Sequence, residues 1–437
     1  MEITGIFDQG FWTVEVLQAT STYPAIWHGC LALAAIHKRQ RLMPADTSIK
    51  HARKRLYVFA LQQYNLSLSH LMVIIRNRAP IYSQRETMLF CCLLFTGICS
   101  LLGDPKPALM HTKGGLQMYY EWKFYKELDS PSPDNTTGKR IFSPEALNAI
   151  ISSSEVQMIT RVGGQYTPKW RREQMLQRCS RRPFKSVSQA YLELQPLASG
   201  LLEVMRFSGV PSEIRPIEAQ PDVFFQHRQE LSLWKHKLDV LRAQNKSQGL
   251  SLDGFDLVEV NWLALHMCLR ATANADEVAW DQFLPDFTRI MDVYEDVVQR
   301  ATKSRIEKRE AGSVFSLTSV MCEMLAFVGS NCRDRIVRRR AIALLKKWPQ
   351  KDGIWDTGLI ATMCEAKAQI EEGAALCPDK NCPCIVEDFI CNDHRIASSP
   401  MEFDDDGNTI IQLTTVREWK MGKPGKKLVL AKRHVRV

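Results

Sequence analysis

The stretch that decides the fold class reads Cys332-Arg333-Asp334-Arg335-Ile336-Val337-Arg338-Arg339-Arg340-Ala341-Ile342-Ala343-Leu344-Leu345-Lys346-Lys347-Trp348. Its apolar residues recur at steps of three and four, the period of an amphipathic α-helix. The predicted buried face consists of Ile336, Val337, Ala341, Leu344, Leu345 and Trp348. Five arginines and two lysines are expected on the opposite, solvated face. A binding strip for phosphate or an acidic partner is the less favoured alternative.

The same helical period recurs in most of the chain. Apolar residues repeat at this spacing in 50–77, 223–242 and 283–301, and no strand-like alternation interrupts these segments. The predicted architecture is therefore all-α, with long antiparallel packed helices. A long loop is expected at about 125–145, where proline, serine and asparagine accumulate.

The last forty or so residues have a different pattern. Short runs at 401–403, 409–419 and 427–433 are separated by turn residues at 404–408 and 422–425, which predicts a small β meander. We predict a helical domain over 1–394 and a short β-rich tail over 395–437.

Composition limits the classes of protein that are compatible with this chain. With 437 residues and 45% hydrophobic content, it is a folded protein of two or three domains or one large helical assembly. The net charge of +9 permits an acidic or nucleic-acid partner without requiring one. The first residues lack the pattern of a signal peptide, which predicts an intracellular protein. The apolar segment 87–103 is short for a membrane span and contains Cys91 and Gly97, so we predict a buried core helix and no membrane association.

Thirteen cysteines in this chain are expected to be small buried hydrophobes in a reducing compartment. One stretch is dense enough for a metal: Cys377, Cys382, Cys384, Cys391 and His394. Four such ligands could hold a structural zinc ion, although only Cys391 and His394 have a typical pair spacing. A loop without metal is the favoured interpretation. We assign no catalytic, cofactor-binding or metal-ligating residue.

Five short motifs occur in order between about residues 11 and 372. They read Phe11-Trp12 with Ile26-Trp27-His28-Gly29-Cys30-Leu31-Ala32-Leu33-Ala34-Ala35-Ile36-His37; Ala60-Leu61-Gln62-Gln63-Tyr64-Asn65; Leu89-Phe90-Cys91-Cys92-Leu93-Leu94-Phe95; Ala108-Leu109-Met110-His111-Thr112-Lys113-Gly114-Gly115-Leu116; and the opening stretch with Asp352-Gly353-Ile354-Trp355-Asp356. In this order they resemble the helical regulatory domain of fungal zinc-cluster transcription factors.

The resemblance implies a nuclear regulator of transcription, in a class that often controls metabolic gene clusters. Its implied partners are the transcription machinery or other regulators, and a small-molecule effector is possible for such a domain. The family's DNA-binding module uses six cysteines and two zinc ions, yet the first cysteine here is Cys30. Either a first exon is missing from the gene model, or the regulator works without its own cluster. Direct sequence-specific DNA binding is not expected from this chain alone.

Two other sequence features allow a functional and a structural interpretation. Mid-helix glycine costs about 1 kcal/mol relative to alanine, so the pair Gly114-Gly115 predicts close approach of a neighbouring helix rather than a phosphate loop. The basic stretch Lys169-Trp170-Arg171-Arg172, with Arg178 and Arg181-Arg182, suits nucleic acid or nuclear import. A solvated face is again the favoured interpretation.

The chain contains no sequence motif of the enzyme classes that we considered. A helical terpene cyclase would carry acidic metal ligands on a helix, but Asp404-Asp405-Asp406 precedes a glycine turn. The segment from Asn392-Asp393 has Ile396 and Pro400 where such an enzyme's second metal motif needs a hydroxyl and a carboxylate. Hydrolase, zincin and dinucleotide motifs do not occur. The alternative to a regulator is therefore a non-DNA-binding interaction or small-molecule-binding protein.

Overall fold

The fold is predominantly helical, as the sequence predicts. The computed structural model describes residues 7, 9–42, 47–77, 79–128, 140–162, 178–206, 221–271, 277–307, 314–318, 321–373, 389–404 and 406–431. Within these residues there are fourteen α-helices, a small sheet inside the helical body and a second sheet near the C-terminal end.

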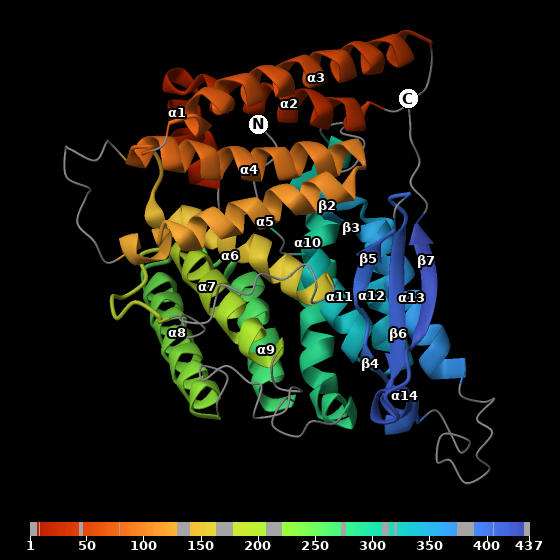
Figure 1. Ribbon diagram of the computed structural model, residues 1–437. Helices are drawn as coiled ribbons and strands as arrows, with labels where there is room; N and C mark the ends of the chain where they lie inside the picture. Colours follow the sequence, from red (N-terminus) through yellow and green to blue (C-terminus); the bar gives the residue numbers. More distant parts are fainter. Residues whose placement is uncertain are drawn as a thin grey trace.

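The first layer consists of the helices nearest the N-terminus (Figure 1). Its elements are the π-helical turn η1 (Phe11–Glu15), α1 (Val16–Thr22), α2 (Pro24–Arg41), α3 (Thr47–Ile75), α4 (Tyr82–Leu102) and α5 (Pro105–Glu121). Helix α2 packs against both α3 and α4. The predicted core helix at 87–103 is confirmed, because it forms most of α4, is largely buried and ends at Gly103.

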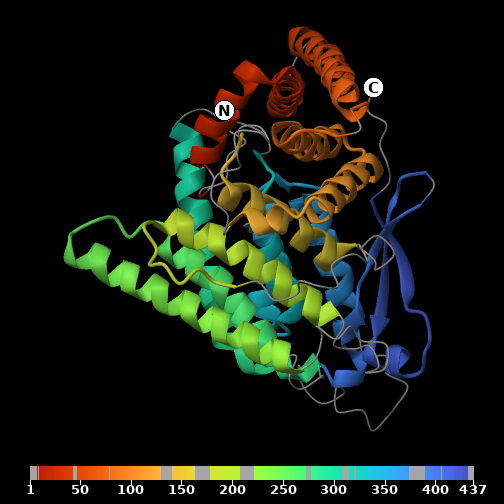
Figure 2. The same ribbon diagram turned by 60° about the vertical axis from the view of Figure 1, so that its left-hand side comes forward.

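The second layer is made of α6 (Pro144–Arg161), α7 (Val187–Arg206), α8 (Pro221–Ser247) and α9 (Phe255–Ala271). The predicted loop at 125–145 is shorter at both ends, because the 3-10 turn η2 (Phe124–Leu128) precedes it and α6 begins at Pro144. Residues 129–139 lie outside the described residues. Helix α8 lies on the side of the molecule away from the C-terminal sheet (Figure 2).

The third group follows the 3-10 turn η5 (Glu277–Phe283) and contains α10 (Leu284–Glu307), α11 (Met321–Asn331), α12 (Arg335–Lys347) and α13 (Thr357–Glu372). A sheet of β1 (Val314–Ser316), β2 (Gln350–Asp352) and β3 (Trp355–Asp356) lies among them. Strand β1 pairs with β2 in parallel, and β2 pairs with β3 antiparallel. Sequence periodicity missed these strands because two or three residues are too few to show alternation.

The predicted β-rich tail is confirmed with one correction. After the turn η8 (Asn392–His394), strands β4 (Ile396–Ser398), β5 (Met401–Phe403) and β7 (Lys426–Ala431) all pair antiparallel with β6 (Thr409–Thr415). The predicted strand 409–419 is wrong beyond Thr415, because α14 (Val416–Lys420) begins there. A capping box explains the change: Glu418 N–H donates to Thr415 Oγ1, and Thr415 N–H donates to Glu418 Oε2.

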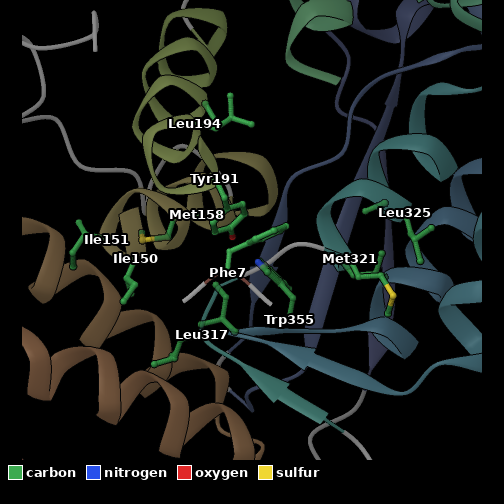
Figure 3. Packing of buried hydrophobic residues seen from close by; sticks show 14 of the residues in the cluster. Phe7, Ile150, Ile151, Met158, Tyr191, Leu194, Leu317, Met321, Leu325 and Trp355 are labelled. Atoms are coloured by element: carbon green, nitrogen blue, oxygen red, sulfur yellow. The ribbon is translucent and has the colours of Figure 1, made fainter. Parts of the chain in front are cut away.

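Residues from all three helical groups meet in one apolar core. Phe7 stacks on Tyr191 of α7, with ring centroids 4.6 Å apart, and lies beside Trp355 of β3 (Figure 3). Met158 of α6 and Met321 and Leu325 of α11 belong to the same buried cluster. The chain therefore buries its longest-range contacts at the junction of the helical groups.

The motif Gly353-Ile354-Trp355-Asp356 has a structural role at each of three positions. Gly353 adopts φ +53° and donates its N–H to Ser316 O, where an added Cβ would lie 2.2 Å from Gln157 Oε1. The Trp355 indole is buried and donates to Gln157 O. Asp356 Oδ1 accepts from Leu359 N at 2.7 Å and so caps α13.

Helix α12 has the predicted apolar face, since five of the six residues assigned to that face are buried, but two residues depart from the prediction. Ile336, assigned to the buried face, is 73% exposed. Arg338, assigned to solvent, is 0% exposed, and Arg333 just before the helix is also buried. Arg339 follows the prediction, with its side chain 70% exposed. The buried face is wider than predicted, and it accommodates Arg338 because this arginine has a buried ion-pair partner.

The partner that the two arginines share is Glu371 of α13, which is fully buried. Glu371 Oε1 lies 2.9 Å from Arg333 Nη2, and Glu371 Oε2 lies 2.5 Å from Arg338 Nη2. Oε1 also accepts from Ile396 N at 2.8 Å, which ties strand β4 to α13. Burial would raise the pKa of Glu371, but the charges of Arg333, Arg338 and Lys367 outweigh it and lower the pKa to about 2.

The network continues to the neighbouring turn and strand. Arg333 Nη2 lies 2.7 Å from Glu277 Oε2 in η5, while Arg338 Nε donates to Cys332 O. Arg395, just before β4, is buried and forms two hydrogen bonds with Asp281 at 2.8 and 2.7 Å. Arginine suits these positions because its planar fork makes several hydrogen bonds at once.

Replacing Arg338 by alanine should destabilise the protein by roughly 3 kcal/mol, because it leaves the buried Glu371 carboxylate short of one partner. The matched control is Arg339→Ala, a neighbouring exposed arginine, which should change stability by less than about 0.5 kcal/mol. Urea unfolding of the full chain measures both. Equal losses for the two variants would contradict the role given to the network.

The adjacent glycines of α5 should differ when each is replaced by alanine. A Cβ on Gly115 would lie 3.2 Å from Cys92 Cβ of α4, whereas none of the described atoms lies within 4 Å of a Cβ on Gly114. The predicted close approach is therefore confirmed for Gly115 and wrong for Gly114. Gly114→Ala should raise stability by about 1 kcal/mol through helix propensity, and Gly115→Ala should gain less or lose stability. A higher melting temperature for Gly115→Ala than for Gly114→Ala would contradict this.

Candidate functional site

A cavity of about 320 Å³ lies between the second and third helical groups. Helices α6, α7, α9, α11 and α13 contribute to its wall, and so do residues of strand β4. Most lining side chains are apolar, among them Leu194, Ala198, Leu265, Trp280, Met324 and Phe327. A largely apolar pocket of this size with a few polar groups is the usual form of a small-molecule site.

One lysine lies in this apolar wall. Lys367 of α13 lines the cavity, is only 5% exposed, and has no hydrogen-bond or ion-pair partner among the described residues. Burial, together with the nearby charge of Arg333, lowers its pKa to about 8, and the charges of Glu371 and Glu277 oppose this shift only in part. A buried ammonium without a partner costs stability, so its position in a cavity needs an explanation.

Other polar groups of the wall differ in how they are used. Gln195 of α7 is 8% exposed and has no hydrogen-bond partner among the described residues. Glu323 accepts from Thr160 Oγ1, and Asn261 donates to Leu257 O. Glu277 is already paired with Arg333. Lys367 and Gln195 are therefore two groups of the wall that remain available to a ligand.

The thiol in the cavity wall is not an activated nucleophile. Cys268 lines the cavity, but burial raises the pKa of this thiol to about 12, so it stays protonated near neutral pH. The other described cysteines have no disulfide partner, and all but Cys92 are buried. The largely apolar wall of the cavity suits the binding of a small molecule.

The predicted metal stretch is described only in part. Cys391 Sγ and His394 Nδ1 lie 3.3 Å apart, whereas Cys377, Cys382 and Cys384 lie outside the described residues. Within the described ranges, no three His, Cys, Asp or Glu side chains are grouped to hold a metal ion. Zinc binding by this stretch stays a prediction.

The second basic stretch and the acidic triplet form no candidate site in the described part of the chain. Residues 169–172 lie outside it, while Arg181 is 3.0 Å from Glu230 and Arg182 is exposed. Asp404 Oδ1 accepts from Asn408 N in a turn, and Asp405 is outside the described residues. Asp393 pairs with Lys420.

Among the residues that the structure describes, two helices are long and apolar enough to cross a membrane by length and composition alone: residues 48–75 in α3, and α4. Helix α4 is mostly buried within the protein. Helix α3 packs on α2 and exposes apolar side chains on its other side, including Phe59, Leu66 and Val73.

The stability cost of Lys367 should be measurable. Its folded pKa of about 8 lies below its ordinary 10.5, a difference that corresponds to roughly 3 kcal/mol. Because the folded state binds the proton less tightly, the cost is full below pH 8 and disappears as the pH rises towards 10.5. Lys367→Met should therefore be more stable than wild type at pH 7, and the difference should shrink by pH 10. Thermal unfolding at both values measures this, and a variant less stable at pH 7 would contradict it.

Comparison with known proteins gives one informative match. No family model matches the chain, and no solved structure matches it. Over 322 residues the chain is 22% identical to the aspercryptin biosynthesis cluster-specific transcription regulator atnN of Emericella nidulans. The match covers 69% of this chain and 49% of atnN, so the chain spans about half the length of that protein. The chain is thus a distant relative of a fungal cluster-specific transcription regulator.

Proposed function

We propose that this protein regulates transcription in a fungus, with its helical body as the regulatory part. The similarity to atnN over 69% of the chain is the observation that carries this proposal. The five sequence motifs point to the same class, and the mainly helical architecture agrees with it. By the same similarity, the regulated genes belong to a biosynthetic cluster, and the protein acts in the nucleus with other regulators or the transcription machinery.

Contact with DNA bases is proposed to come from outside these 437 residues. The cysteines of the described region are mostly buried in packed helices, as Cys30 is in α2, which does not suit a zinc cluster that reads DNA. We further propose that residues 1–394 act as the regulatory domain and 395–437 as a tail docked on it. The hydrogen bond from Ile396 N to Glu371 and the ion pair of Arg395 with Asp281 support this docking.

The cavity favours a second candidate, a small-molecule-binding protein without a role in transcription. Its support is the largely apolar cavity with the buried Lys367 in its wall. The two candidates differ in where the protein acts. We assign no catalytic role to either.

Chromatin association of the tagged full-length protein in its native host tests the main proposal. Immunoprecipitation should enrich the promoters of a biosynthetic gene cluster, and deletion of the gene should change their transcripts several-fold. A cytosolic protein whose deletion leaves every transcript unchanged would refute the proposal and favour the small-molecule-binding alternative.

A further inference from the structure

The walls of the cavity indicate what kind of ligand it binds. Its walls are mostly apolar, yet one side chain in them carries a charge that the fold leaves unpaired. Lys367 is 5% exposed, lines the cavity, and lacks an ion-pair partner among the described residues, while Glu277 and Glu371 are committed to arginines. The fold therefore places in the cavity wall an ammonium that forms no direct ion pair, although the carboxylates of Glu277 and Glu323 lie in the same wall.

Packing alone does not explain this lysine. A methionine has a similar length and could fill the same space without the cost of a buried charge. Residues that reduce stability in this way are concentrated at functional sites. An anion that enters the cavity would pair with the ammonium in a low-dielectric environment, where such a pair is strong.

The size of the cavity limits the anion. A cavity of about 150 Å³ is large enough to bind benzene, with its six carbons. At about 320 Å³ this cavity has room for a molecule of about twelve non-hydrogen atoms. Most of those atoms must be apolar to match the side chains of Leu194, Leu265 and Phe327.

The charges of the wall limit the anion further. A single ammonium balances a single negative charge, and the carboxylates of Glu277 and Glu323 in the same wall would repel a dianion such as a phosphate monoester. Next to Lys367 a cation is disfavoured by the ammonium, and Glu277 is already paired with Arg333. These conditions together are met by a monocarboxylate with an apolar body.

We propose that the cavity binds an apolar monocarboxylic acid of about twelve non-hydrogen atoms, whose carboxylate pairs with the ammonium of Lys367. The inference rests on the proposed function for its biological meaning: the acid would be the effector of the regulator. Gln195 offers an amide to the same ligand from α7.

The position of Lys367 links the ligand to the C-terminal sheet. Lys367 and Glu371 are four residues apart, one turn of α13, and Glu371 accepts the N–H of Ile396 in β4. Ile396, Ala397 and Ser399 also line the cavity. A bound acid would therefore contact the helical body and the tail together, and its binding should strengthen their docking.

Isothermal titration calorimetry of the purified full chain with decanoate tests the inference. Decanoate should bind wild type in the micromolar range, and Lys367→Met should weaken it by about 30-fold or more, because a charge partner in a buried pair is lost. Uncharged 1-decanol should bind both proteins within about threefold, since its apolar contacts are unchanged. Lys367→Arg, which keeps the charge, should retain part of the decanoate affinity.

The matched control is Lys346→Met on α12, where the lysine side chain is 54% exposed. This variant should bind decanoate as wild type does. Hydrogen exchange in β4 should slow when decanoate is bound.

The inference is overturned if octanoate, decanoate, dodecanoate and 2-naphthoate all fail to bind folded wild type at millimolar concentration, or if Lys367→Met binds decanoate as tightly as wild type. Chromatin association is measured separately, so a regulator that occupies promoters but binds no acid would refute this inference alone.

Discussion

The rest of the structure depends on one buried interaction, the pairing of Glu371 with Arg333 and Arg338. A carboxylate and two guanidinium groups have been removed from water at this point, which is tolerable only because each group has several partners in good geometry. The interaction joins α13 to α12, to the turn η5 through Glu277, and to β4 through the N–H of Ile396. It therefore sets how the third helical group is oriented and where the C-terminal sheet docks.

The candidate site follows from the same helix. Lys367 lies one turn from Glu371, so the orientation of α13 that buries Glu371 also directs the lysine towards the cavity. The two charges differ in their surroundings. Glu371 has partners from three segments, while Lys367 has none among the described residues, and this contrast separates a structural charge from one that is free for a ligand. The similarity to atnN makes the chain that carries this cavity a distant relative of a cluster-specific transcription regulator.

Part of the fold could be predicted from the sequence, but the candidate site could not. Helical periodicity correctly identified α3, α8 and α10, because their apolar spacing is a local property of the chain. The cavity was missed, because its wall combines residues from distant segments such as Leu194, Leu265 and Lys367. Lys367 carried no visible signal: in the sequence it is one charged residue in an ordinary helix. The capping-box sequence Thr415-Val416-Arg417-Glu418 does indicate the start of α14, and the strand prediction overlooked it.

The sequence by itself determined the helical class, the C-terminal β-rich tail and the resemblance to fungal regulators, because short-range patterns encode all three. The tertiary structure alone decided which cations are buried. Arg338 and Arg339 are neighbours of the same type in the same helix, yet one is fully buried and the other is 70% exposed. Arg338 lies on the face of α12 that meets Glu371, thirty-three residues further along the chain, and Arg339 does not. A buried charge needs a partner close in space, and distance along the chain does not reveal that partner.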